Sequence, residues 1–67
     1  MSVLKRNLDI VFKETTNGND EGRRYIAKSL DGGTGWGVFD RRTKRFLKDR
    51  EISQISAHDL RQNDLLN

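Results

Sequence analysis

The chain has 67 residues, of which 33% are hydrophobic, 34% are charged and none is cysteine, and its formal net charge is +3. A domain of this length buries only about 60% of the surface of its unfolded chain, so we expect a small stability unless a disulfide, a metal or a second subunit adds to it. The absence of cysteine excludes disulfides and thiolate metal sites, and one histidine cannot supply the ligands of a structural zinc. Residues 1–67 are therefore interpreted as a single small domain with no metal and no cofactor, in which self-association is the remaining source of added stability.

Membrane insertion and secretion are not indicated. The longest uninterrupted apolar run covers residues 10–12, whereas a helix that spans a bilayer needs about 20 apolar residues. Residues 1–15 also lack the apolar core and the small-residue cleavage site of a signal peptide. We therefore expect a cytoplasmic protein that does not enter a membrane.

Residues 3–12 fit two kinds of secondary structure. Apolar side chains recur at alternate positions, as on a strand, and also at the spacing of one helical face. The β-branched pair Ile10 and Val11, followed by Phe12, favours a strand. We predict that strand over residues 8–14.

A polar loop with the turn dipeptide Asn17-Gly18 follows. Alternating apolar and polar residues then predict strands over residues 23–30, 36–41 and 45–48. The connections between these strands are too short for parallel crossovers, so we expect antiparallel pairing.

Two positions in the second half of this region carry specific turn signals. Asp40 suits the first position of a type I turn, and a residue near Lys44 is expected to need a positive φ. Gly37, within a predicted strand, indicates either a bulge or a place where Trp36 or a neighbouring chain lies over bare backbone.

The end of the chain predicts a short helix. Ser56 is a favourable N-cap, Asp59 stands at the third helical position, and good helix formers continue through Leu65 and Leu66. A helix of about ten residues does not persist alone in water, so it must pack on the sheet. The predicted fold class is thus α+β: a small antiparallel β-sheet of three to four strands, in a β-meander, with a short C-terminal helix on one face and the other face exposed.

Patterns of catalytic or metal-binding residues are weak. The single histidine, His58, has no nucleophile in a recognisable arrangement and is expected to be an exposed helical residue. The glycines of residues 33–37 lack the spacing and the trailing Lys-Ser/Thr of a P-loop, and are interpreted as a tight turn around Trp36. The loop of residues 17–21 lacks the spacing of an EF-hand. We therefore expect no enzymatic activity.

Basic residues are the strongest functional signal. Residues 40–50 contain six basic and two acidic side chains, a local excess of four positive charges that exceeds the net charge of the chain. Basic side chains neutralise phosphates, and aromatic rings stack on bases, so this combination is typical of nucleic-acid binding. The candidate site for nucleic acid or an acidic protein surface comprises seven basic residues: Arg23, Arg24, Arg41, Arg42, Lys44, Arg45 and Lys48.

Two functional hypotheses follow. The first is a small non-enzymatic module that assists nucleic-acid binding through a basic hairpin. The alternative is a protein-interaction module, such as an inhibitor or adaptor, or a homodimer, that docks by a sheet edge or an exposed aromatic face. Because so small a protein needs its rings for the core, we predict that Phe12, Phe46 and one of Phe39 and Trp36 are largely buried.

Overall fold

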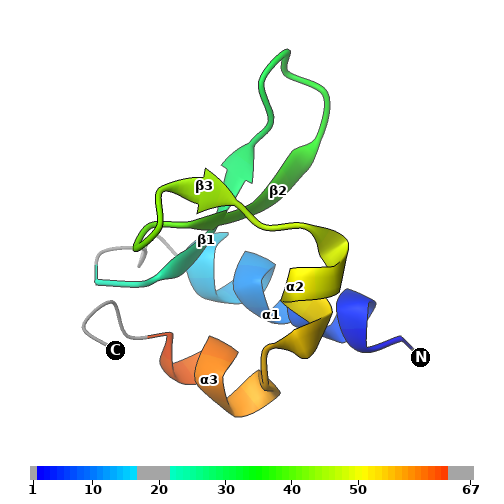
Figure 1. The fold of residues 1–67 in the computed structure, drawn as a ribbon, viewed down its shortest axis with the longest axis vertical. Coiled ribbons are helices and arrows are strands. Elements are labelled where there is room, and N and C mark those ends of the chain that lie inside the picture. Colours follow the sequence, from blue (N-terminus) through cyan, green and yellow to red (C-terminus); the bar gives the residue numbers. More distant parts are fainter. Residues whose placement is uncertain (1, 17–21, 64–67) are drawn as a thin grey trace.

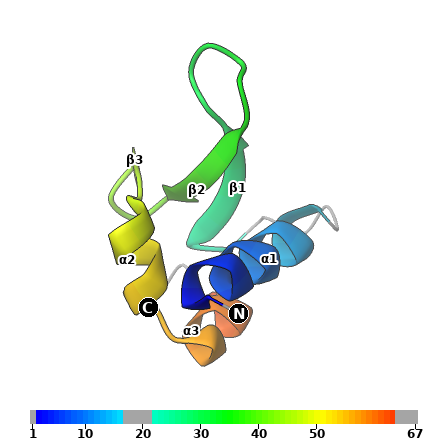
Figure 2. The ribbon, with the colours of Figure 1, turned by 90° about the vertical axis from the view of Figure 1, so that its right-hand side faces the viewer.

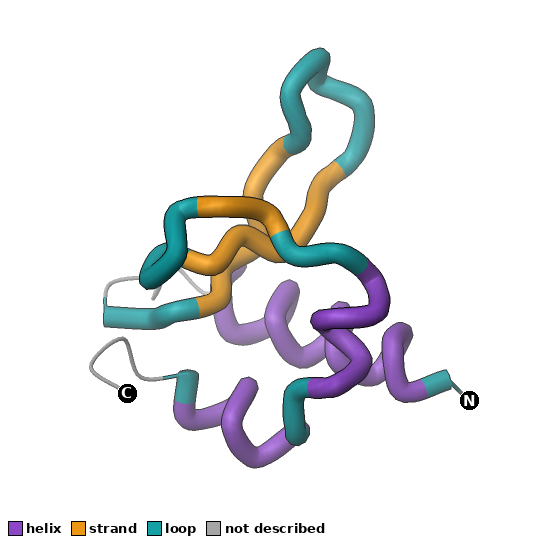
Figure 3. The backbone as a smooth tube through the Cα atoms, viewed as in Figure 1, coloured by secondary structure: helices purple, strands orange, loops and turns teal. Residues whose placement is uncertain are grey.

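The computed structural model describes residues 2–16 and 22–63, and within them the chain forms a three-stranded antiparallel sheet in the order β1-β2-β3 and three helices. The bounds are α1 Val3–Thr16, β1 Tyr25–Ser29, β2 Trp36–Asp40, β3 Arg45–Phe46, α2 Asp49–Gln54 and α3 Ala57–Gln62. The helices lie together below the strands, and the loop between β1 and β2 extends away from them (Figures 1, 2 and 3). The predicted α+β class, with an antiparallel sheet and a short final helix, is confirmed.

The first element is a helix, so the predicted strand over residues 8–14 is wrong. α1 buries Asn7 and Val11, which are four residues apart and therefore lie on one helical face. This face packs against β1, α2 and α3. Strand propensity of the pair Ile10 and Val11 is a preference of at most about 1 kcal/mol, and burial of a continuous helical face outweighs it.

The core lies between the helices and one face of the sheet, here called the inner face. The buried apolar residues of the core are Val11, Tyr25, Val38, Ile52 and Leu60. None of the three phenylalanines belongs to this set, and Phe12 is 44% exposed because it lies one position beyond Val11 on α1. The prediction that Phe12 is largely buried is therefore wrong, and Trp36, with 38% of its surface exposed, is not a core residue either.

The alternation predicted for the strands is confirmed by the register. Tyr25 pairs with Asp40 and Ala27 with Val38, so these side chains share the inner face. The residues between them therefore point to the opposite face of the sheet, here called the outer face. The pairing is continuous through Gly37, whose partner is Lys28, so no bulge forms at this glycine.

Side chains hydrogen-bond to the backbone along the edge of β1 that has no neighbouring strand. Asn63 has a left-handed backbone with a φ of 45°, and its amide oxygen accepts from the N–H of Tyr25 at 2.6 Å while its amide nitrogen donates to the carbonyl of Tyr25 at 2.7 Å. The N–H of Ala27 donates to the hydroxyl of Thr15 at 3.3 Å. Asn63 thus takes the place of a neighbouring strand at the start of β1.

Two short helices follow the sheet, of which the first was not predicted. α2 begins after Lys48, whose N–H donates to the carboxylate of Glu51 at 3.0 Å, and it buries Ile52. The predicted N-cap of α3 is confirmed, because the hydroxyl of Ser56 accepts from the N–H of Asp59 at 3.1 Å. Both helices have six residues, so their stability depends on packing.

Asn7 joins α1 to the end of α2. Its amide nitrogen donates to the carbonyls of Ile52 and Ile55, at 2.7 and 2.9 Å, where α2 ends. The carbonyl of Ile52 also accepts from the backbone N–H of Ile55 at 3.3 Å. The side-chain oxygen of Asn7 accepts from the guanidinium of Arg6 at 3.2 Å. A buried polar residue on α1 therefore positions α2.

The predicted turn at Asn17-Gly18 lies outside the described residues, as do Leu65 and Leu66. The prediction that the last helix continues past Gln62 is wrong, because α3 ends there and Asn63 is its left-handed C-cap. Within the two described segments, no helix is both long enough and apolar enough to cross a membrane.

Candidate functional site

Asp40 organises the turn between β2 and β3. One carboxylate oxygen of Asp40 accepts from the N–H groups of Arg42 and Thr43, at 2.9 and 3.4 Å. The backbone carbonyl of Asp40 accepts from the N–H of Lys44 at 2.7 Å, and Lys44 has a φ of 61°. The predicted positive φ near position 44 is therefore confirmed. Residues 41–44, called the basic turn below, contain three basic side chains and no acidic one.

A buried ion pair ties this turn to the start of β1. Both carboxylate oxygens of Asp40 accept from the guanidinium of Arg24 at 3.1 Å, and Asp40 is 2% exposed. Burial disfavours the charged carboxylate, but the hydrogen bonds from Arg24 and from the turn outweigh it and hold the pKa of Asp40 below its usual range. The charge of Asp40 is thus directed at Arg24 and at the backbone of the turn.

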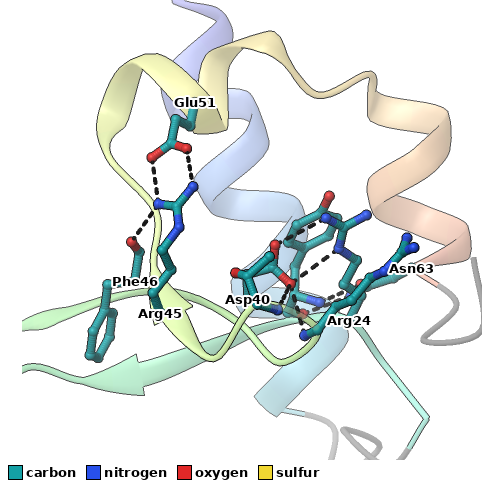
Figure 4. Close-up of polar contacts among 9 residues, drawn as sticks. Arg24, Asp40, Arg45, Phe46, Glu51 and Asn63 are labelled. Atoms are coloured by element: carbon teal, nitrogen blue, oxygen red, sulfur yellow. Dashed lines mark hydrogen bonds and ion pairs between the residues drawn. The ribbon is translucent and has the colours of Figure 1, made fainter.

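A second pair ties β3 to α2 (Figure 4). The guanidinium of Arg45 donates to both carboxylate oxygens of Glu51, at 3.0 and 2.6 Å. These bonds, together with the N–H of Lys48, lower the pKa of Glu51 to about 2. Arg45 also donates to the carbonyl of Phe46 at 3.4 Å, so its guanidinium connects the hairpin to α2.

Arg23 connects two helices. Its guanidinium lies 3.0 Å from the carboxylate of Glu14 on α1 and donates to the carbonyl of Arg61 on α3 at 3.3 Å. Three of the seven predicted site residues, Arg23, Arg24 and Arg45, therefore make ion pairs with carboxylates of the same chain. The structure does not gather all seven on one surface.

The other four predicted residues lie in the basic turn and at the start of α2. The side chains of Arg42, Lys44 and Lys48 are exposed, and Arg41 is half-buried. The basic turn connects β2 directly to β3 and thus stands beside the last residue pairs of the sheet. Arg45 is exposed as well, although it is paired with Glu51.

The two strands that the basic turn connects, β2 and β3, also contribute to the outer face of the sheet. This face consists of six residues: Ile26, Lys28, Leu30, Gly37, Phe39 and Phe46. Phe39 and Phe46 are cross-strand partners, with ring centroids 5.2 Å apart and planes at 77°. The ammonium of Lys28 lies over the ring of Phe39, 4.3 Å from its centroid. Figure 4 shows the ring of Phe46 on the opposite side of β3 from the guanidinium of Arg45.

Gly37 allows the outer-face side chains to approach one another. A Cβ atom at this position would lie 3.2 Å from a methyl group of Leu30 and 3.3 Å from the ring of Phe46. The predicted close approach over bare backbone is thus confirmed, but the approaching groups are Leu30 and Phe46, where Trp36 or a neighbouring chain was expected. Phe39 and Phe46 are half-buried, while Lys28 and Leu30 are exposed.

Sequence reasoning missed Lys28 as a site residue and assigned the rings to the core. Alternation alone already placed Lys28 with Ile26 on one side of its strand. The missing information was the register, which puts Lys28 and Phe39 on the same face of neighbouring strands. The second missing fact was which face the helices cover.

A cleft of about 250 Å³ lies on the inner side, between the β2–β3 hairpin and α2. Its lining residues are Arg24, Tyr25, Asp40, Thr43, Arg45, Leu47, Glu51, Gln54 and Ile55. Each guanidinium in the cleft is paired with a carboxylate, so its charges are balanced and its contacts fix the turn to the rest of the fold. Among residues 2–16 and 22–63, no group of three or more histidine, cysteine or acidic residues could hold a metal ion.

No family model, curated protein or solved structure matches the chain at a significant level.

Proposed function

We propose that the chain acts in the cytoplasm as a small non-enzymatic module that binds nucleic acid, with the basic turn, Lys28 and Lys48 on phosphate groups. The observation that carries this proposal is the position of Asp40. Its carboxylate is buried and is directed at Arg24. The next four residues, 41–44, contain three basic side chains and no acidic one.

The rigidity of the turn supports the same proposal. Asp40 holds the backbone of Arg42, Thr43 and Lys44 through three hydrogen bonds, and Arg24 holds Asp40. A surface that is ordered before binding loses less conformational entropy when it binds. A fixed array of cations next to an open sheet face fits a phosphate backbone.

The test is fluorescence anisotropy with a labelled oligonucleotide at low and rising salt. About five phosphate contacts, one for each basic residue of the turn and for Lys28 and Lys48, predict a slope of log affinity against log salt near −4.5 for a duplex. The double variant Lys44→Ala/Lys48→Ala should weaken binding strongly. Lys5→Ala/Lys13→Ala is the matched control, because it removes the same charge from exposed residues of α1.

Two results would overturn the proposal. The first is no complex at tens of micromolar protein and low salt. The second is an equal loss of affinity in the two double variants, because binding would then follow net charge and not the basic turn.

A second candidate function, protein docking, is favoured by a separate surface. Phe12 of α1 and Trp36 of β2 are 44% and 38% exposed, and their ring centroids are 5.4 Å apart. Docking by a sheet edge is less well supported, because side chains occupy outward backbone groups of β1 at Tyr25 and Ala27. A partner on the aromatic pair would shift the emission of Trp36, the sole tryptophan, and light scattering tests a homodimer directly.

A further inference from the structure

We infer that the outer face binds the unpaired bases of a single-stranded nucleic acid, with Phe39 and Phe46 as stacking groups. The inference rests on the proposed function and narrows it from nucleic acid in general to single strands.

The two rings form a compact pair on the uncovered side of the sheet. Phe39 and Phe46 are direct cross-strand partners at a centroid distance of 5.2 Å. Every buried apolar core residue belongs to the helices or to the inner face, so the core does not account for these two rings. Aromatic side chains on an open sheet surface are suited to stacking against bases.

The angle between the rings selects for a flexible strand. Their planes meet at 77°, so two bases that stack on them cannot remain parallel to each other. Bases in a duplex stay paired and stacked, with their faces covered by neighbours. Only a single strand can turn successive bases apart, and we therefore expect the rings to contribute nothing to duplex binding.

The charge around the rings matches a phosphate backbone. The outer face and the basic turn together contain four basic residues and no acidic one: Lys28, Arg41, Arg42 and Lys44. Lys28 is exposed, and its ammonium already lies above the ring of Phe39. A base that stacks on this face of Phe39 displaces the ammonium, which can then contact the phosphate of the same nucleotide. A polyanion gains favourable electrostatic contacts with these four cations that an uncharged partner lacks, so nucleic acid is the better match.

The experiment compares an oligothymidine with a DNA duplex of equal length at one salt concentration. Phe46→Leu and Phe39→Leu retain apolar bulk but remove the ring. Each should weaken binding of the single strand by roughly tenfold and leave duplex binding unchanged. Phe46→Tyr keeps a ring and should retain the affinity of the unmodified chain.

Trp36→Leu is the matched control. Trp36 is also exposed and aromatic, but its pairing with Ser29 and its contact with Phe12 place it on the inner side. Its loss should not alter single-strand binding, and its emission in the unmodified chain should not respond to the oligonucleotide.

Each outcome bears on one of the two claims. If neither the single strand nor the duplex binds, the proposed function fails and this inference fails with it. If both bind and the leucine variants affect them equally or not at all, the proposed function stands and the stacking role is refuted. If an acidic peptide binds with the same dependence on Phe46 while the oligothymidine does not, the outer face is a protein-binding surface.

Two measurements guard against variants that fail to fold. Circular dichroism establishes that each variant retains the fold. Proton NMR of the unmodified chain follows the ring signals of Phe39 and Phe46 directly, and ring signals that do not move at saturating oligothymidine also refute the inference. Lys28→Met, which removes the charge but keeps an apolar stem, should weaken binding of the single strand.

Discussion

Asn63 provides the sharpest test of how the fold is held together. Asn63→Ala removes the side chain that satisfies both the N–H and the carbonyl of Tyr25 in a buried position. Each buried backbone group left without a partner costs about 1–3 kcal/mol. Alanine at the φ of 45° adds about 1 kcal/mol. We expect a loss of about 4 kcal/mol, against a total stability of roughly 3–10 kcal/mol for a chain of this length.

The two contributions can be separated by a second variant. Asn63→Gly loses the same two hydrogen bonds but accepts the left-handed backbone, so it should be about 1 kcal/mol more stable than Asn63→Ala. Urea denaturation, followed by circular dichroism, measures both. Gln62→Ala is the control, because Gln62 is exposed at the end of α3 and should change stability by less than about 0.5 kcal/mol. If both Asn63 variants lie within about 1 kcal/mol of the unmodified chain, Asn63 does not stabilise the edge of β1 as argued.

Three further predictions concern the turn, the acid response and the helix contact. Lys44→Gly should raise the free energy of unfolding by about 0.5–1 kcal/mol, because glycine adopts the positive φ without strain, and it should weaken oligonucleotide binding. Lys44→Ala should weaken binding without this gain in stability. A glycine variant no more stable than the alanine variant would show that the backbone at position 44 is not strained. Since the pKa values of Asp40 and Glu51 are lowered in the folded state, their stabilising contribution is complete above their ordinary values of 3.8 and 4.5 and is lost as the pH falls, for Glu51 towards about 2. Urea denaturation along this pH range should show that loss in the unmodified chain and a flatter profile in Asp40→Asn/Glu51→Gln, and parallel profiles would refute the assignment. Asn7→Leu should destabilise by about 1–3 kcal/mol, because it removes the donor to the carbonyl of Ile55 and one of the two donors to the carbonyl of Ile52, and a stability equal to that of the unmodified chain would contradict the proposed contact.

Local sequence signals identified the turns and the alternation of the sheet. Asp40 with a positive φ at Lys44, the cap at Ser56 and the opposite faces of neighbouring strand residues all follow from preferences of one residue and its nearest neighbours. Such preferences act within a few residues of the chain. They could therefore be predicted without knowledge of the fold.

Only part of the candidate site could be predicted from local sequence signals. Clustered charge identified the basic turn, but charge in a sequence does not show which cations already have partners. Arg24 and Arg45 pair with carboxylates at sequence separations of 16 and 6 residues. Lys28 joins the outer face through the register of two strands. Both kinds of contact depend on how distant segments meet.

What the sequence determined by itself is the α+β class, the antiparallel hairpins, the turn at Asp40 and the start of the last helix. Tertiary structure decided that residues 3–16 are helical, that α2 forms at all and which face of the sheet is open. The physical reason is the same in each case. A short segment of this chain, whether Val3–Thr16 or Asp49–Gln54, gains most of its stability from the surface it buries against others, and that surface exists only in the assembled fold.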